Sequence, residues 1–296
     1  MPFAGEVAAL ATAMCWTVTS MAFESAGRRI GSLAVNLIRL VMAMGLLALY
    51  TWITRGRPLP TDASAHTWCW LSLSGVVGFT IGDLCLFRAF VVLGARLSML
   101  LMSLVPPMTA IMGLAILDER LEAIDWAAMA VTVAGVTWVV AERGQPTPQP
   151  EASPWATGVL LGVLGAAGQA IGLVLSKHGM RGYDPFAATH IRIIAGIVSF
   201  AIVFSIIGWW PVVFRALRNR AAMAWTTLGA IFGPFLGVSL SLLAVAHTET
   251  GVAATIMALV PVLIIPPAVF IRKERVSLRA VLGSILAVGG VGLLFQ

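Results

Sequence analysis

Residues 102–106 read MSLVP, and residues 257–261 read MALVP. The two copies lie 155 residues apart, and each is followed, thirteen residues beyond its proline, by a Glu-Arg pair. Both copies lie in long apolar runs. We therefore expect each proline inside a membrane helix, where its ring bends the helix and leaves the carbonyl four residues earlier without a donor. Bent helices of this kind are tolerated at membrane depth only where they face protein or a watery cavity. A proline-broken helix that occurs twice in one chain therefore indicates a binding site in a duplicated membrane protein.

The composition is that of an integral membrane protein. Of the 296 residues, 59% are hydrophobic and 11% are charged, and the mean hydropathy is +0.95. Soluble domains average about 25% charged residues. The net charge of +6 does not indicate nucleic-acid binding, because the basic residues are spread over short loops, as is usual beside lipid headgroups, rather than clustered on one surface.

The sequence offers no metal or catalytic centre. The three cysteines, Cys15, Cys69 and Cys85, lie in apolar surroundings without paired spacing, which favours small hydrophobic residues over disulfides or zinc ligands. The four histidines lack His-x-x-x-His spacing, and no Gly-x-Ser-x-Gly elbow or phosphate-binding loop occurs. We therefore expect no metal, no cofactor and no enzymatic activity.

Ten stretches of the chain are long and apolar enough to cross a membrane, which takes about 20 residues for a hydrocarbon core of about 30 Å. The first five lie near Glu6–Gly27, Leu33–Thr54, Trp68–Phe90, Leu97–Leu117 and Leu121–Val140. The second five lie near Trp155–Leu175, Pro185–Ile207, Ala221–Ala246, Val252–Ile271 and Val276–Phe295.

The ten spans divide into two similar halves. An offset of 155 residues runs without a gap from span three to span five, and an offset of 153 pairs Arg39 with Arg192 in spans two and seven. The pairs at offset 155 include Trp70 with Trp225, Gly78 with Gly233, Gly82 with Gly237, and Gly135 with Gly290. We assign residues 1–141 to the first repeat, residues 142–154 to a proline-rich linker and residues 155–296 to the second repeat, all within one structural unit.

Five spans per half is an odd number, so the second half enters the membrane from the opposite face. The sequence therefore predicts an all-α integral membrane protein with ten transmembrane helices in two inverted five-helix repeats. Loops after the odd-numbered spans hold eleven Lys and Arg residues, and loops after the even-numbered spans hold five. Because cytoplasmic loops carry the excess of positive charge, we expect both termini outside.

Two stretches of the chain resemble the repeat of the drug/metabolite transporter superfamily. The first is Ala95–Val136, with Leu-Val-Pro-Pro, Asp118-Glu119-Arg120-Leu121 and Gly135; the second is Gly251–Val291, with Leu-Val-Pro and Lys273-Glu274-Arg275. The closer likeness is to the ten-helix EamA-type permeases, and among these to bacterial amino-acid exporters of the YddG type. The resemblance implies a multi-pass protein of the bacterial inner membrane that exports amino acids or similar metabolites.

The candidate substrate cavity begins at the proline-broken helices. Pro106 and Pro261 free the carbonyls of Met102 and Met257, and Pro107, Pro266 and Pro267 free three more. Free carbonyls bind an ammonium group, and thioethers adapt to varied side chains, so we place Met99, Met102 and Met257 in the cavity and give the prolines a role in gating. The alternative is that the prolines bend helices for packing and the methionines fill gaps.

Two arginines lie about two turns inside apolar helices. A charge at that depth costs about 2.5–3.5 kcal/mol and requires a partner or water. One interpretation is that Arg39 and Arg192 bind a substrate carboxylate, with Asn36 and His190 nearby on a similar face. The simpler alternative is that both side chains snorkel to the headgroups or make structural hydrogen bonds.

Asp83 is the one acid expected well inside a span. Five residues of helix separate it from Arg88, a workable reach for an arginine, so we expect these two residues to form an ion pair. The alternative is that Asp83 is a proton or cation site.

Trp16 and Thr19 make the middle of span one polar and aromatic, and Gln169 occupies the matching place in span six. Such groups orient a small polar ligand. The alternative is helix packing through hydrogen bonds between helices.

These residues predict alternating access around a central cavity, with the broken helices as gates. The compact multidrug relatives in the superfamily use a central glutamate in the first span for proton coupling, whereas Glu6 and Glu24 lie at the ends of this span. We therefore expect no proton coupling. A proton-coupled multidrug or organic-cation pump is the alternative, and a membrane-embedded enzyme is a remote one. Because one chain holds both repeats, we expect a monomer in the lipid bilayer.

Overall fold

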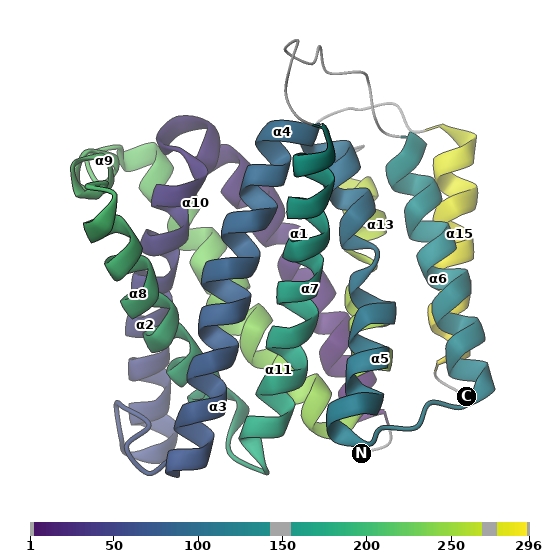
Figure 1. Ribbon diagram of the computed structural model, residues 1–296, viewed down its shortest axis with the longest axis horizontal. Coiled ribbons are helices and arrows are strands. Elements are labelled where there is room, and N and C mark those ends of the chain that lie inside the picture. Colours follow the sequence, from purple (N-terminus) through teal and green to yellow (C-terminus); the bar gives the residue numbers. More distant parts are fainter. Residues whose placement is uncertain (1–2, 143–154, 268–276, 295–296) are drawn as a thin grey trace.

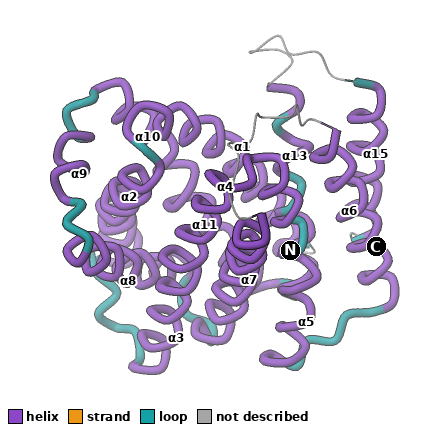
Figure 2. Tube along the Cα trace, turned by 45° about the horizontal axis from the view of Figure 1, so that its top comes forward, coloured by secondary structure: helices purple, strands orange, loops and turns teal. Residues whose placement is uncertain are grey.

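The computed structural model describes residues 3–142, 155–267 and 277–294, and every regular element in these ranges is helical (Figures 1 and 2). In the first half the elements are α1 Ala4–Ile30, α2 Ser32–Arg55, α3 Ala65–Gly75, η1 Val76–Gly82, α4 Asp83–Met102, α5 Val105–Leu117 and α6 Ala123–Glu142. In the second half they are α7 Trp155–Met180, α8 Pro185–Ile206, α9 Trp210–Ala216, α10 Arg220–Ala230, η2 Ile231–Gly237, α11 Val238–His247, α12 Thr250–Met257, α13 Val260–Leu263 and α15 Leu278–Leu293.

Within the described ranges, six helical segments have the length and apolar composition of a membrane span. Several predicted spans agree with the helices to within a few residues: the seventh, for instance, coincides with α8 except at its last residue. The predicted linker falls mostly outside the described residues, as does the second Glu-Arg pair, Glu274-Arg275.

Two seven-residue π-helical segments interrupt the third and eighth predicted spans. η1 and η2 begin and end 155 residues apart, and each ends on a glycine of the repeat, Gly82 or Gly237. π-helical turns inside longer helices occur frequently at functional sites. The predicted spans treated these segments as ordinary α-helix.

The prolines begin helices rather than bend them. α4 ends at Met102 and α12 ends at Met257, and the next helices start with Val105-Pro106-Pro107 and Val260-Pro261. The expectation of a proline inside a bent helix is therefore corrected to a complete break. A proline in the first helical turn lacks only an N–H that has no partner there in any case. Among the described backbone hydrogen bonds, none ends on the carbonyl of either methionine.

The two repeats contact each other through α6 and α15, which lie side by side (Figure 1). A Cβ on Gly135 would lie 2.5 Å from the backbone nitrogen of Ala287, and a Cβ on Gly290 would meet Thr132. Gly290 and Ala287 stand 155 residues after Gly135 and Thr132, so one contact is the counterpart of the other. Reciprocal pairing of this kind is expected of two units related by a two-fold axis.

The other interface interlocks the repeats. α7 packs on α3, η1 and α4 of the first half, whereas α1 packs on α10, η2 and α11 of the second half. Small residues let these backbones approach closely, since a Cβ on Gly168 would lie 2.8 Å from the Cα of Gly82. The labelled N and C ends lie at the same end of the bundle (Figure 1), as the inverted repeats require. Which side of the membrane this end faces stays a prediction.

We predict that Gly290→Ala destabilises the protein by about 1–3 kcal/mol, the usual cost of overpacking. The new methyl group would lie 2.7 Å from the Thr132 backbone nitrogen and 3.0 Å from the Ala128 carbonyl, so α6 and α15 must separate. Thermal unfolding in detergent measures the effect. Gly289→Ala is the matched control, because nothing lies within 4 Å of a Cβ there. Equal melting temperatures for the two variants would contradict the α6–α15 contact.

Candidate functional site

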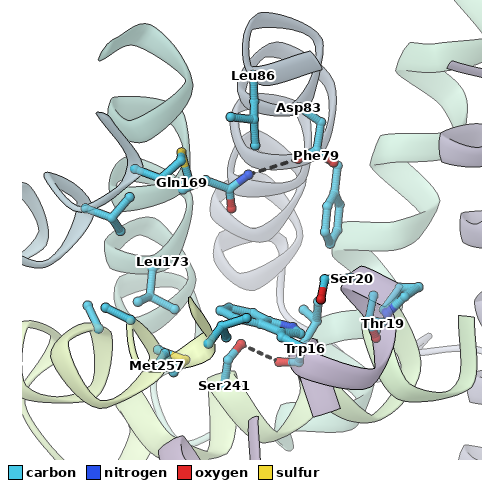
Figure 3. Close-up of a pocket in the computed structure, with 18 of the residues that line it drawn as sticks. Trp16, Thr19, Ser20, Phe79, Asp83, Leu86, Gln169, Leu173, Ser241 and Met257 are labelled. Atoms are coloured by element: carbon cyan, nitrogen blue, oxygen red, sulfur yellow. Dashed lines mark hydrogen bonds between the residues drawn. The ribbon is translucent and has the colours of Figure 1, made fainter. Parts of the chain in front are cut away.

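A cavity of about 330 Å³ lies between the two halves of the chain. Its wall takes residues from α1, α2, η1, α4, α5 and α6 of the first half and from α7, α8, η2, α11, α12 and α13 of the second. Figure 3 shows part of this wall. The side chains with polar groups in this wall are Trp16, Thr19, Ser20, Arg39, Asp83, Ser103, Gln169, Arg192 and Ser241. The remaining side chains are mostly aliphatic, with two methionines and Phe79 among them.

The first charged group in the wall is an ion pair. The Arg39 guanidinium on α2 donates to a carboxylate oxygen of Asp83 at the start of α4. Gln169 Nε2, from α7, donates to the other carboxylate oxygen at 3.0 Å (Figure 3). The Arg39 guanidinium also lies over the Phe23 ring, 5.1 Å from its centroid. Arg39 and Asp83 thus neutralise each other in a place where either charge alone would be costly.

The second charged group is Arg192 on α8, which is 6% exposed. Its guanidinium lies over the Phe79 ring, 4.9 Å from the centroid, and its Nε is buried without a hydrogen-bond partner. No described residue forms a hydrogen bond or an ion pair with it. The charged groups in the described cavity wall are therefore two cations and one anion, and the surplus is positive.

The opposite part of the wall carries an indole ring, hydroxyl groups and thioethers. Trp16, Thr19 and Ser20 of α1 lie across the cavity from Asp83 and Gln169, with Ser241 and Met257 beside them (Figure 3). Met102 and Met257, the last residues of the two broken helices, both line the cavity. The structure therefore brings the two copies of the opening motif to one space.

Seven of the ten residues nominated for the cavity meet in this wall, and Asp83 joins them: Trp16, Thr19, Arg39, Met102, Gln169, Arg192, Met257 and Asp83. The side chain of Met99 lies outside the described part of the structure. Pro106 and Pro107 are absent from the described wall, whereas the residue before them, Val105, lines the cavity. Val260 does so next to Pro261, whereas Pro266 and Pro267 follow the end of α13 and are absent from the described wall.

Two nominated residues do not reach the cavity. Asn36 and His190 are 1% and 0% exposed and are absent from the described wall. His190 precedes Arg192 by two residues, which turns it about 200° away around the helix. Asn36 precedes Arg39 by three residues and is turned by about 60°, which is enough to take it out of the cavity and into the packing around α2.

The predicted ion pair between Asp83 and Arg88 is also wrong. Arg88 is exposed, and Asp83 pairs with Arg39 instead. Five residues of α-helix turn a side chain by about 140°, so Arg88 leaves the helix on a different side from Asp83. Arg39 comes from another helix, which sequence spacing does not reveal.

Several wall residues were missed from the sequence, among them Phe79, Pro234 and Val238. They lie in or directly after the two π-helical segments. The glycines that the repeats share, Gly78 with Gly233 and Gly82 with Gly237, mark these segments and would have identified them.

We predict that Asp83→Asn destabilises the protein by about 3–5 kcal/mol, because it leaves Arg39 as an uncompensated buried charge. The double variant Arg39→Gln, Asp83→Asn should be more stable than the single variant, since both charges are then gone. Thermal unfolding of the four proteins of this double-mutant cycle gives the coupling energy. Additive effects would show that the ion pair contributes nothing.

Comparison with known proteins agrees with this architecture. The model of the EamA-like transporter family matches residues 3–141 and again residues 156–296. No match was found among curated proteins. Among solved structures 28 chains match, and one, described only as "Crystal structure of protein", has 17% sequence identity and a TM-score of 0.76. That likeness covers 99% of this chain and 97% of the other, and at such low identity it bears on the fold alone. The prediction of an all-helical membrane protein built from two repeats is confirmed, and the chain belongs to the EamA-like transporter family.

Proposed function

We propose that this protein exports amino acids across the bacterial inner membrane by alternating access, as a monomer and without proton coupling. Membership of the family establishes a multi-pass membrane transporter of small molecules. The observation that carries the finer proposal is the cavity between the two repeats, which combines charged and apolar surfaces in one space.

The chemistry of the wall suits a zwitterion with a variable side chain. The surplus positive charge attracts a carboxylate. The carbonyl ends of α4 and α12, at Met102 and Met257, are suited to accept hydrogen bonds from an ammonium group. The aliphatic and thioether surface accommodates side chains of different shapes. A volume of about 330 Å³ is at the small end of ligand pockets, which favours a metabolite over a larger drug.

An organic-cation pump is less well supported. It requires a buried acid that is available to the substrate, and Asp83 is already bonded to Arg39 and Gln169. The same bonds oppose a role for Asp83 in proton transfer, since protonation would break the ion pair. They support the proposal of movement down a gradient.

A polar network between the repeats supports alternating access. Glu119, directly after α5, accepts hydrogen bonds from the Thr250 backbone N–H at 2.8 Å and from its hydroxyl at 2.6 Å. Lys177, near the end of α7, lies 2.6 Å from the other Glu119 oxygen and donates to the Thr248 carbonyl at 2.6 Å. Glu249, the residue before α12, makes no side-chain cap. Glu119, from the other repeat, caps this helix instead.

This network, which we call the α12 gate, lies at the end of the bundle that holds the labelled chain termini (Figure 1). α12 carries Ala254, Met257 and Ala258 of the cavity wall on its side and end. Release of Glu119 would free α12 to move, which would open the cavity toward that end. In an alternating-access cycle the network therefore acts as a closing contact.

Transport is tested with purified protein in liposomes that are loaded with the common L-amino acids, nucleosides or quaternary amines. We expect counterflow uptake of amino acids and of neither other class. Uptake should be unchanged when a proton gradient is imposed. Strict dependence on that gradient would remove the uncoupled mechanism, and its loss in Asp83→Asn would locate the coupling site. Preferential uptake of quaternary amines would favour the cation pump.

We predict that Glu119→Ala loosens the α12 gate. Loss of a helix cap costs about 0.5–2 kcal/mol, so amide exchange at Thr250 and the residues that follow should quicken by about 2- to 30-fold. Hydrogen–deuterium exchange with mass spectrometry reads this out. Glu122→Ala is the matched control, because Glu122 is exposed in the same loop. Identical exchange in the two variants would show that Glu119 does not hold α12.

A further inference from the structure

The two repeats place an arginine at equivalent positions, but they do not give both of them a partner. Arg39 and Arg192 are related by the offset of 153 residues, and both line the cavity. Asp83 is the first residue of α4, directly after η1. Its equivalent at the offset of 155 is Val238, the first residue of α11, directly after η2. The carboxylate that neutralises Arg39 thus has a valine as its counterpart in the second repeat.

The residue that bonds to Asp83 also has a counterpart of a different kind. Gln169, which donates to Asp83, corresponds at the offset of 153 to Trp16. The first cluster is therefore Arg39, Asp83 and Gln169, which is neutral and hydrogen-bonded. Their counterparts in the other repeat, which we call the second cluster, are Arg192, Val238 and Trp16, and they include a cation but no carboxylate. All six residues line the same cavity.

Arg192 has no hydrogen-bonded anion among the described residues, although the charge of Asp83, which is bonded to Arg39, also acts on it. Its guanidinium lies on the Phe79 ring, and a Cβ on Gly78 would lie 3.3 Å from its Nη2, so a side chain at position 78 would crowd it. Asp83 is the only acid in the described cavity wall, and Arg39 and Gln169 already hold both of its oxygens. A buried cation without a hydrogen-bonded partner is costly, and a guanidinium presents a planar fork that matches a carboxylate.

We propose that the substrate's own carboxylate completes the second cluster: it binds Arg192 in the place that Val238 leaves empty and that Asp83 fills in the other repeat. Arg192, and not Arg39, is then the residue that selects for a carboxylate. This inference rests on the proposed transport of small metabolites, and it adds that a free carboxylate is the recognised group. A carboxamide of the same size offers no negative charge to Arg192.

The proposal is tested by comparing an amino acid with its own carboxamide. The L-amino acid that gives the fastest counterflow is chosen first, and both compounds are then compared as substrates and as ligands of the protein in detergent. In the wild-type protein the acid should bind about 10- to 100-fold more tightly than the carboxamide, as expected for one charge-assisted contact. Arg192→Gln should lower affinity for the acid to that for the carboxamide and leave the carboxamide unchanged.

Val238→Asp supplies the missing carboxylate from the protein itself. It should reduce binding of the acid by about tenfold or more and leave the protein at least as stable, since Arg192 then has an internal partner. Val238→Asn is the matched control, with the same shape and no charge, and it should keep the preference for the acid over the carboxamide.

The outcomes separate the two proposals. A wild-type protein that transports no compound of the amino-acid panel overturns both. A wild-type protein that transports the acid and the carboxamide equally, with Arg192→Gln unchanged, overturns the assignment of Arg192 and leaves the transport function standing. Equal loss in Val238→Asp and Val238→Asn shows an effect of shape, which also overturns the assignment.

Discussion

The positive charge of a guanidinium inside an apolar helix bundle must be compensated by neighbouring groups. This requirement determines how the side chains are arranged at the centre of the molecule. The fold meets it for Arg39 with Asp83 and Gln169, so that the group combines residues from three helices and both repeats. That contact joins α2, the start of α4 and α7 at one point. It also places the charged part of the cavity wall where the two halves of the chain meet. The positive charge of Arg192 needs compensation as well, and among the described residues the protein supplies the face of Phe79 and the shared charge of Asp83 but no hydrogen-bonded anion.

Duplication of the repeat explains why the two sides of the cavity share one backbone frame but differ in their side chains. The two halves build the same frame, with π-helical segments, helix breaks and close glycine contacts at corresponding positions. A site on the pseudo-two-fold axis of such a frame would start with two identical faces. The exchange of Asp83 for Val238 and of Trp16 for Gln169 makes the faces chemically different. One face then carries a complete ion pair, and the other carries a cation without a carboxylate of its own.

The proposed alternating access assigns different roles to different parts of this frame. α6 and α15 contact each other through small residues and contribute little to the cavity wall, which gives them the character of a scaffold. The broken helices end at the cavity, and the start of α12 is held by Glu119 and Lys177 from elsewhere in the bundle. A helix that is only eight residues long and is capped by a distant carboxylate has few local bonds to resist displacement. In the proposed cycle, displacement of α12 therefore costs less free energy than displacement of α6 and α15.

Much of this could be predicted from the sequence, because apolar length, proline chemistry and repeated spacing act locally. The membrane helices, the two repeats and the places where helices are interrupted near Pro106 and Pro261 follow from such patterns, although the interruptions are complete breaks and not the expected bends. The sequence also nominated Arg39, Arg192, Trp16 and Gln169, since polar groups at membrane depth need a reason. Tertiary structure alone decided their partners. Asp83 bonds to a residue 44 positions earlier rather than to Arg88, and His190 turns away from the cavity, because contacts between helices depend on how each helix is rotated and how the π-helical turns shift it. No spacing within one helix contains that information.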